Sequence, residues 1–288
     1  MVPGWPRITL VTPVLNGARY LEAAIESVLG QGYPDLEYIV VDGGSTDGTL
    51  DLIRHHERRL AWWTSEPDRG MYDALNKGFA RSSGEVMGWL SATDLLHQGS
   101  LLVVGGVFRD LPEVDWITGM PTALTEEGMA VEIGPFPRWT RPRFLLGANR
   151  YIQQESTFWR RRLWMKAGAR VDDSRTMASD FELWLRFFRH ARLYPVRALL
   201  GAFRHHRDSL WVRNEAECRR LYDEMLSREL DQVNGDRLLR AAGRVSLWAR
   251  QRPGVGPLWG KLVSALLPTI PGPDRPPVVR HDGTRWVL

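Results

Sequence analysis

Polar residues gather at three points of the sequence where an apolar, strand-like run ends: 12–16, 42–45 and 91–94. The second cluster, Asp42-Gly43-Gly44-Ser45, places a carboxylate next to two glycines. Such a carboxylate can accept hydrogen bonds from the ring N–H of uracil or guanine or from a ribose hydroxyl, and the glycines let the backbone approach a nucleotide closely. The same residues are also good turn formers, so a nucleotide contact and a simple turn both stay open on these residues alone.

Hydrophobic periodicity predicts the elements that would bring these clusters together. Four apolar, β-branched runs are typical of buried strands: Arg7–Val14, Tyr38–Val41, Leu60–Ser65 and Glu85–Leu90. Segments with helical spacing lie between them: Tyr20–Leu29, Thr49–Arg58 and Met71–Arg81. This alternation predicts an α/β fold with a mostly parallel sheet and helices on both faces. Ligands of such sheets bind beyond the carboxyl ends of the strands, which is where the three polar clusters fall.

The second half of the chain is less regular. Asp115–Gly119 and Ala130–Ile133 are expected to be strands, Ala178–His190 is expected to be a helix, and a last strand is expected within 193–203. Beyond residue 212 the sequence changes to charged helices and then to a Pro/Gly-rich tail. The expected organisation is a domain over 1–212, with halves of about 1–110 and 111–212, and a helical C-terminal extension over 213–288.

The composition argues against several classes of protein. Charged residues make up 25% of the 288 residues and the net charge is +4 without a basic arm, so a diphosphate or an anionic membrane surface is a better partner than nucleic acid. No apolar run reaches the ~18 residues of a transmembrane helix, and the N-terminus lacks a signal-peptide pattern. Cys218 is the single cysteine, so no internal disulfide can form, which fits the cytoplasm. We interpret most of the thirteen tryptophans as core side chains, with stacking on sugar rings as the alternative.

Ordered segments give the first two thirds of the chain a likeness to a known family. They read VTPVLN at 11–16, VVDGGSTDGT at 40–49, EPDRGMYDALNKG at 66–78, GWLSATD at 88–94, QQESTFWRR at 153–161, MASDFELWLRF at 177–187 and FRHHRDS at 203–209. In this order they resemble the signatures of glycosyltransferase family 2 over about residues 6–210. The resemblance implies the GT-A fold, in which a nucleotide-binding α/β half joins an acceptor half.

The resemblance also implies a donor site in which Asp42 holds the base and ribose. The implied nucleotide-sugar-binding residues are Thr12, Pro13, Asn16, Asp42, Gly43, Gly44, Ser45, Asp68, Arg69, Gly70, Tyr72, Asp73, Lys77, Thr93 and Arg204. Asp73 and Lys77 are four residues apart and share one helix face, where they either reach the donor or form a simple surface ion pair.

The segment that resembles the metal motif of the family departs from its usual form. Family members usually carry paired aspartates there, whereas this chain has Ser91-Ala92-Thr93-Asp94 with a single carboxylate. Phosphate oxygens and waters supply most ligands of such a cation, so Asp94 could still hold Mn²⁺ or Mg²⁺ against a diphosphate. The alternative is that Asp94 only caps the next helix. His206 is a second expected metal ligand, with a structural role as its alternative.

Asp180 is the general base that the resemblance implies. It would remove the proton of the acceptor hydroxyl as that oxygen attacks the anomeric carbon, and attack opposite the leaving group inverts this centre. Asp180 could instead be a helix cap, and Glu182 is the second choice for the base. Gln154, Glu155 and Trp184 are expected on the acceptor side, although family members often have proline where Glu155 stands.

The expected activity is transfer of a sugar from a UDP- or GDP-type donor to a saccharide or lipid-linked saccharide, in the synthesis of surface polysaccharide. Two alternatives stay open: a nucleotide-sugar-binding protein with weakened catalysis, and a sugar-phosphate nucleotidyltransferase. The basic amphipathic and apolar segments within 236–267 are expected either to contact the inner face of the cell membrane or to pack on the main domain or on a partner subunit of a homo-oligomer.

Overall fold

The first half of the chain forms the predicted parallel sheet. The computed structural model describes residues 4–134, 139–147, 150–207, 209, 213–233, 236–252, 255–256, 258–259, 262 and 276–288. Its first elements are β1 (Ile8–Val14), α1 (Ala18–Leu29), β2 (Leu36–Asp42), α2 (Thr49–His56), the 3-10 turn η1 (Glu57–Arg59), β3 (Trp62–Ser65), α3 (Met71–Arg81) and β4 (Val86–Trp89). β1 pairs in parallel with both β2 and β4, and β2 pairs in parallel with β3. Register places Val14 beside Asp42 and Asp42 beside Ser65, so the polar loops leave the sheet at one edge.

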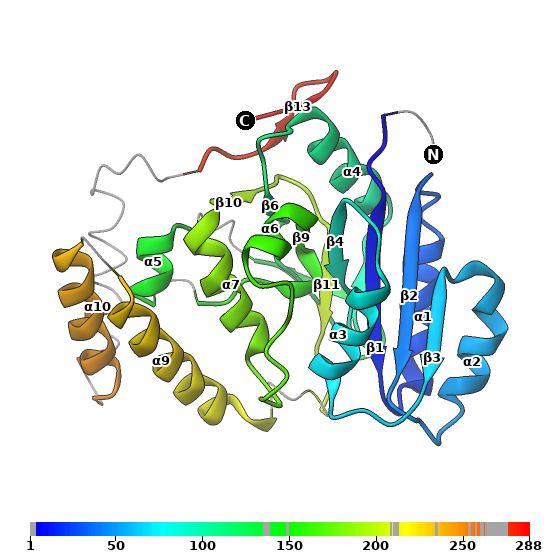
Figure 1. The fold of residues 1–288 in the computed structure, drawn as a ribbon, viewed down its shortest axis with the longest axis horizontal. Helices are drawn as coiled ribbons and strands as arrows, with labels where there is room; N and C mark the ends of the chain where they lie inside the picture. The colour runs from blue at the N-terminus through cyan, green and yellow to red at the C-terminus, as the bar shows by residue number, and fades with distance from the viewer. Residues whose placement is uncertain are drawn as a thin grey trace.

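Strands from the second half extend this sheet on the other side of β4. The order across the seven strands is β10-β6-β9-β4-β1-β2-β3 (Figure 1). β9 (Thr157–Arg160) runs antiparallel to β4 and to β6 (Trp116–Thr118), and β10 (Leu193–Pro195) runs parallel to β6. Helical spacing and apolar runs did not predict β9, because its strand conformation depends on pairing with distant segments. The overall α/β architecture with a mostly parallel sheet is confirmed.

A smaller sheet lies beside the polar edge of the large one. Its order is β5 (Leu95–Leu96), β11 (Gly201–Arg204), β7 (Thr122–Leu124) and β8 (Ala130–Ile133). β5 begins directly after Asp94 and pairs antiparallel with β11. The expected last strand within 193–203 is therefore two strands in two sheets, β10 and β11. Helix α4 (Ser100–Asp110) follows β5 and covers the large sheet near the N-terminal strand (Figure 1).

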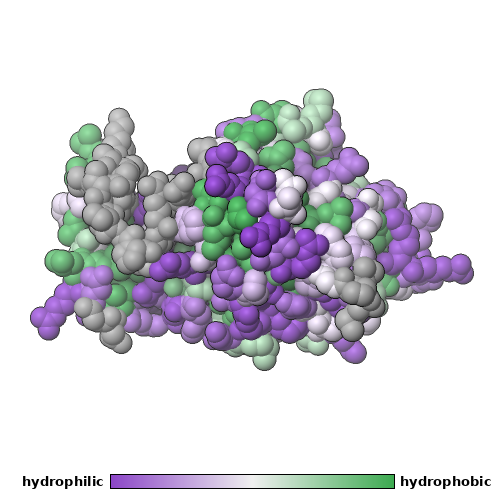
Figure 2. All heavy atoms as spheres, turned by 90° about the horizontal axis from the view of Figure 1, so that it is seen from above, coloured by the Kyte–Doolittle hydropathy of each residue, from purple (hydrophilic) through white to green (hydrophobic). Residues whose placement is uncertain are grey.

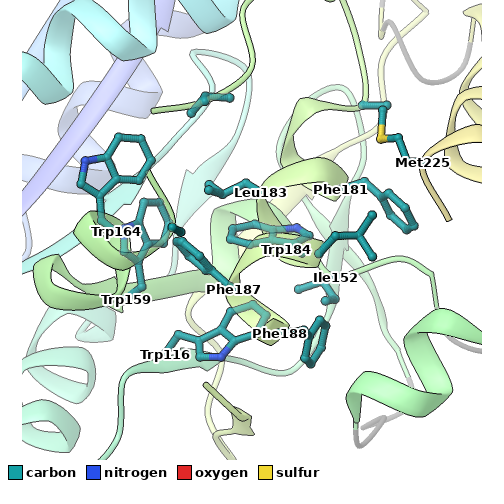
Figure 3. Packing of buried hydrophobic residues seen from close by; sticks show 14 of the residues in the cluster. Trp116, Ile152, Trp159, Trp164, Phe181, Leu183, Trp184, Phe187, Phe188 and Met225 are labelled. Carbon is teal, nitrogen blue, oxygen red and sulfur yellow. The ribbon is translucent and has the colours of Figure 1, made fainter. Parts of the chain in front are cut away.

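Aromatic side chains fill the core between the large sheet and helix α7 (Ser179–His190). Trp184 of α7 stacks on Trp89, with ring centroids 5.8 Å apart, and on Trp116 at 5.7 Å. Trp159 and Phe187 belong to the same cluster (Figure 3). Among the described residues, six tryptophans are at most 3% exposed, as the core interpretation predicted: Trp89, Trp116, Trp139, Trp159, Trp164 and Trp184.

The C-terminal helices pack on the same core. α9 (Glu215–Asp231) contributes Tyr222 and Leu226 to the cluster that contains Trp184, and its buried Glu229 pairs with Arg141 and Arg189. Those arginines lie in α5 (Arg141–Leu145) and α7, so this ion pair ties three helices together. The remaining short elements are η2 (Gln154–Ser156) and α6 (Arg161–Lys166). The first helix of the expected extension over 213–288, α9, therefore contributes to the same hydrophobic core as residues 1–212.

Helix α10 (Arg237–Arg250) has one packed face and one exposed face. Gly243 and Leu247 are buried, and an added Cβ at Gly243 would lie 2.4 Å from a methyl carbon of Leu230. Leu238 and Trp248 are exposed, and Figure 2 shows hydrophobic side chains on the surface at this end of the molecule. The sequence left open whether 236–267 contacts the membrane or packs on the main domain. One face of α10 packs on the main domain. Most of 251–267 falls outside the described residues.

The end of the chain returns to the N-terminal half. Val279 bridges to Val196 beside the large sheet. β12 (Arg280–His281) and β13 (Trp286–Val287) form a small hairpin, and the Trp286 backbone N–H donates to Asp110 at the end of α4. Within the described residues, no helix combines the length and the apolar character needed to cross a bilayer.

The aromatic core predicts a large difference between two tryptophans in helices. Trp184→Ala should lower the free energy of unfolding by roughly 3–5 kcal/mol, because it leaves a cavity among packed rings. Trp248→Ala should change it by less than about 1 kcal/mol, because the Trp248 ring is half exposed on α10. Urea unfolding followed by circular dichroism measures both. Equal, small effects would show that Trp184 does not support the core.

Candidate active site

One cavity of about 470 Å³ lies where the carboxyl ends of β1 and β4 meet α3, η2, α7 and α9. Residues from all of these elements line it, together with the loops that follow β1 and β4. Asp94 and Asp180, which lie far apart in the sequence, both line this cavity, whereas Asp42 does not.

Asp94 is held at the edge between the two sheets. Its side chain is only 3% exposed, and its Oδ1 accepts a hydrogen bond from the backbone N–H of Arg204 at 2.9 Å. Burial raises the pKa of Asp94 to about 7, although hydrogen bonding from the Arg204 backbone opposes this shift. The positive charge of Arg204 also favours the charged form of Asp94, but within the described residues no lysine or arginine forms a salt bridge with it. Such a buried carboxylate gains from a cation that enters the cavity.

Glu155 is a second buried acid on the same wall. It lies in η2, its side chain is 3% exposed, and its Oε1 has no hydrogen-bond partner. Burial raises the pKa of Glu155 well above its ordinary value, and the negative charge of Asp94 raises it further. Gln154, beside it, donates a hydrogen bond to the carbonyl of Trp89 at the end of β4. Both predicted residues of this segment therefore line the cavity.

Asp180 lies in the first turn of α7 and faces the cavity. Burial raises the pKa of Asp180, while the backbone N–H of Phe181 stabilises its charged form and opposes that shift. The preceding Ala178 has a φ of 67°, a left-handed conformation that costs free energy for any residue other than glycine. The Ser179 N–H donates to the Tyr72 hydroxyl at 3.2 Å, which fixes the start of this helix against α3. The strained turn and this hydrogen bond set the direction of the Asp180 carboxylate.

Glu182 does not share this position. Its carboxylate accepts hydrogen bonds from Arg186 at 2.7–3.0 Å, one turn further along α7, and it is not part of the cavity lining. Trp184 is also absent from the lining, because its ring is stacked in the core. A direct contact of Trp184 with the acceptor does not fit this placement, so its expected place on the acceptor side needs correction.

The structure divides the predicted donor-binding residues into two groups. Those that line the cavity are Pro13, Asn16, Asp68, Gly70, Tyr72 and Thr93. Those that lie outside its lining are Thr12, Asp42, Gly43, Gly44, Ser45, Arg69, Asp73, Lys77 and Arg204. Side chains of the second group, among them Asp42, Arg69 and Arg204, form hydrogen bonds or ion pairs with nearby loops and side chains.

Asp42 joins the loops at the ends of β1, β2 and β3. It is fully buried, and its Oδ2 accepts hydrogen bonds from the Ser65 hydroxyl at 2.6 Å and the Ser45 N–H at 3.1 Å. Ser45 in turn accepts from the Asn16 N–H at 2.7 Å. Contact of Asp42 with a base stays a prediction, and in this structure its carboxylate serves the loop framework.

The glycines beside Asp42 allow close approach of backbone and side chain. Gly44 has a φ of 87°, which favours glycine, and a Cβ at Gly43 would lie 2.8 Å from Oδ2 of Asp68. Thr12 of β1 pairs with Val40 of β2, and its hydroxyl lies 2.9 Å from that of Tyr38.

The charged residues at the start of α3 form ion pairs at the surface. Arg69 contacts Asp73 at 2.7 Å and Asp173 at 2.6 Å, and Lys77 contacts Glu66 at 2.9 Å. The surface ion-pair alternative for Asp73 and Lys77 therefore matches their geometry. A contact of these side chains with the donor stays a prediction.

Arg204 at the end of β11 and His206 just after it both pack on the Tyr20 ring, but they make different further contacts. The guanidinium of Arg204 donates to the carbonyls of Thr93 and Glu126, both at 2.7 Å, so it holds the loop that carries Asp94. His206 lines the cavity, with its ring 5.5 Å from that of Tyr20. His206 is thus positioned toward the cavity, whereas Arg204 positions Asp94.

Sequence reasoning missed several side chains of the cavity wall. Tyr20 and Tyr151 line it, as do Cys218 and Tyr222, which are one turn apart on α9. The charges of Asp94, Glu155 and Asp180 all act on Tyr151, so these groups lie close to one another. The apolar stripe of α9 that contains Cys218 and Tyr222 was a signal for a packed helix, but nothing in it indicated the surface on which α9 packs.

A second acidic group lies away from this cavity. Glu22, Glu26 and His56 have ligand atoms within 4.8 Å of one another, between α1 and α2. His56 contacts Glu22 at 2.9 Å, and Arg59 contacts Glu26 at 2.5 Å. Because Arg59 already neutralises one of the acids, ion pairing accounts for this group.

Comparison with known proteins gives the family of the chain. Residues 9–127 match the model of glycosyl transferase family 2. An uncharacterised glycosyltransferase of Mycobacterium tuberculosis is 31% identical over 206 residues, which cover 69% of this chain and 75% of that protein. A PGL/p-HBAD biosynthesis glycosyltransferase of Mycobacterium bovis is 35% identical over 100 residues, which cover 34% of this chain and 39% of that protein. The chain belongs to glycosyltransferase family 2 and is a transferase enzyme.

Solved structures share the fold at low sequence identity. Residues 1–349 of Staphylococcus aureus TarS, in complex with UDP-GlcNAc, match with a TM-score of 0.67 and 15% identity over 85% of this chain and 72% of that chain. In the longer TarS structure, this chain spans 44% of the length. The mannosyltransferase PcManGT of Pyrobaculum calidifontis, in complex with GDP-Man and Mn²⁺, matches with a TM-score of 0.57 and 18% identity over 93% of this chain and 82% of that chain. The predicted GT-A fold is confirmed.

Proposed function

We propose that this chain transfers a sugar from a nucleoside diphosphate to a hydroxyl group of a saccharide or lipid-linked saccharide, with inversion at the anomeric carbon. The observation that carries the proposal is the convergence of two carboxylates, the buried Asp94 and the partly buried Asp180, on one cavity of about 470 Å³. This volume suits a small-molecule ligand, whose sites measure roughly 300–1,000 Å³. UDP-GlcNAc in TarS and GDP-Man in PcManGT support a donor of the UDP or GDP type.

A divalent cation, Mn²⁺ or Mg²⁺, belongs beside Asp94 in this proposal. The donor set fits such an ion, because Asp94 offers a carboxylate oxygen in a buried, negatively charged cavity. His206 lines the same cavity and is the second residue proposed near the ion. When bound, the cation stabilises the charge that develops on the leaving diphosphate.

Asp180 acts as the general base of the transfer. Its carboxylate takes the proton of the acceptor hydroxyl while that oxygen forms a bond to the anomeric carbon and the bond from this carbon to the diphosphate oxygen breaks. A single displacement of this kind inverts the anomeric centre. The raised pKa of Asp180 suits the role, because a base with a pKa nearer to neutrality binds the proton more strongly.

The acceptor enters from the side formed by η2 and α9 in this proposal. Gln154 and Glu155 line that side, and Tyr151 and Tyr222 add aromatic surface on which a sugar ring can pack. A nucleotide-sugar-binding protein without catalysis, or a nucleotidyltransferase, would not need a base placed as Asp180 is.

Removal of the base should separate the catalyst from a binding protein. Asp180→Asn should lower kcat by roughly 10²–10⁴-fold with little change in the KM of the donor. Glu182→Gln, which removes a carboxylate from the same helix but outside the cavity, should keep kcat within about threefold. In the wild type, kcat/KM should fall as the pH decreases through the raised pKa of Asp180, since the protonated acid cannot accept a proton. Wild-type activity in Asp180→Asn would contradict its role.

Binding of a nucleoside diphosphate at the donor site should raise the melting temperature of the chain. UDP or GDP with Mn²⁺, at about 100 times the dissociation constant, should raise the melting temperature by roughly 5–10 °C, and a chelator should reverse part of the shift. Asp94→Asn should lose the metal-dependent part. Glu22→Gln, in the acidic group outside the cavity, should keep it. No shift with any nucleoside diphosphate would count against the donor site.

The exposed face of α10 is the proposed contact with an anionic membrane. It carries Leu238 and Trp248, with Arg252 stacked over the Trp248 ring at 4.0 Å. Co-sedimentation with vesicles that contain anionic lipid should weaken several-fold in a Leu238→Ala, Trp248→Ala variant. Equal binding by this variant and the wild type would contradict the contact. A homo-oligomer and a cytoplasmic location stay predictions.

A further inference from the structure

Two acids of the cavity lie within electrostatic range of each other, and in the described part of the chain neither forms a salt bridge with a lysine or arginine. Asp94 and Glu155 both line the cavity, and each is 3% exposed. Oε1 of Glu155 has no hydrogen-bond partner, although a buried carboxylate oxygen normally has one. The negative charge of Asp94 acts directly on Glu155, so the two carboxylates are close in space. A buried carboxylate oxygen without a hydrogen bond lowers the stability of the folded chain unless a bound ligand or ion contacts it.

Strand β11 fixes the two acids relative to each other. On one side, the Arg204 N–H donates to Oδ1 of Asp94 at 2.9 Å, and Gly201 pairs with Leu96 of β5. On the other side, the Gly201 N–H donates to the Ser156 hydroxyl at 3.1 Å, directly after Glu155. Both acids are therefore anchored to one short strand.

Gly201 makes this arrangement possible. A Cβ at Gly201 would lie 2.2 Å from the backbone oxygen of Glu155 and 3.0 Å from its Cγ. The backbone of β11 therefore touches the segment of Glu155 with no room for a side chain, and a larger residue would push Glu155 away from Asp94.

We propose that Glu155 binds the divalent cation together with Asp94, and so supplies the second carboxylate that the segment Ser91-Ala92-Thr93-Asp94 lacks. Two hard oxygen donors on one cavity wall suit Mn²⁺ or Mg²⁺ and neutralise a pair of charges that would otherwise repel each other. The inference rests on the proposed function only in that the cation serves the donor, because its binding can be measured without any donor.

The test measures binding of Mn²⁺ alone to the full chain, from the electron paramagnetic resonance signal of the free ion. Glu155→Gln keeps the size of the side chain and removes its charge, and it should weaken Mn²⁺ binding by roughly tenfold or more, as Asp94→Asn should. Glu155→Asp keeps the charge and should bind Mn²⁺ more tightly than Glu155→Gln. Asp180→Asn removes another acid from the same cavity and should weaken binding by less than about threefold, and Glu22→Gln should leave it unchanged.

Thermal unfolding gives an independent readout. Without metal, Glu155→Gln should melt at a higher temperature than the wild type, because it removes one of two adjacent buried charges. Mn²⁺ should then raise the melting temperature of the wild type more than that of Glu155→Gln. A purely structural role for Glu155 predicts the opposite order without metal.

Three results would overturn the inference: wild-type affinity for Mn²⁺ in Glu155→Gln, equal loss in Asp180→Asn and Glu155→Gln, or equal affinity in Glu155→Gln and Glu155→Asp. If sugar transfer occurs and Glu155→Gln binds Mn²⁺ as tightly as the wild type, only this inference fails. If Mn²⁺ binding needs both acids and no sugar transfer is found, the cation site stands and the proposed function fails.

Discussion

Burial of several carboxylates in one cavity is the constraint on which the rest of this structure depends. Asp94, Glu155 and Asp180 face the same space, and burial raises the pKa of each. Removing such acids from water without pairing them with bases destabilises the folded chain. In the proposed function, ligand binding supplies the missing compensation, and the groups that weaken the protein without ligand are those that would bind the ion and accept the proton.

A rigid framework holds these unfavourable groups in place. The stacked rings of Trp89, Trp116 and Trp184 support α7 behind Asp180, and β11 links Asp94 to the segment of Glu155. The left-handed backbone at Ala178 persists because packing on both sides outweighs its local strain. The core that makes the chain stable is thus also the support that keeps the acids converging.

Local pattern was enough to predict the parallel half of the fold. Apolar runs mark β1, β2, β3 and β4, and the rule that ligands bind at strand ends correctly placed Asp94 at the cavity edge. Asp180 needed the family resemblance, because a first-turn aspartate is ordinary helix chemistry. For Asp94 and for Asp180, the residues that indicated a functional role lie within about ten positions of the aspartate in the sequence.

Features that depend on distant pairing could not be predicted in this way. β9 is a strand because it lies between β4 and β6, and Glu155 is buried because Gly201 leaves it room. Cys218 and Tyr222 reach the cavity because α9 packs on α7, which no local pattern indicates. Trp184 looked available to a sugar until its stacking on Trp89 was known, and no local pattern indicated the ion pair between Lys77 and Glu66.

The most direct test of the central claim is a crystal structure of the chain with a nucleoside diphosphate and Mn²⁺, in which anomalous scattering locates the metal. The account predicts one strong manganese peak between the diphosphate and Asp94, in the cavity that Asp180 also faces. A nucleotide bound outside this cavity, or a manganese peak at Glu22, Glu26 and His56 with none beside Asp94, would contradict it.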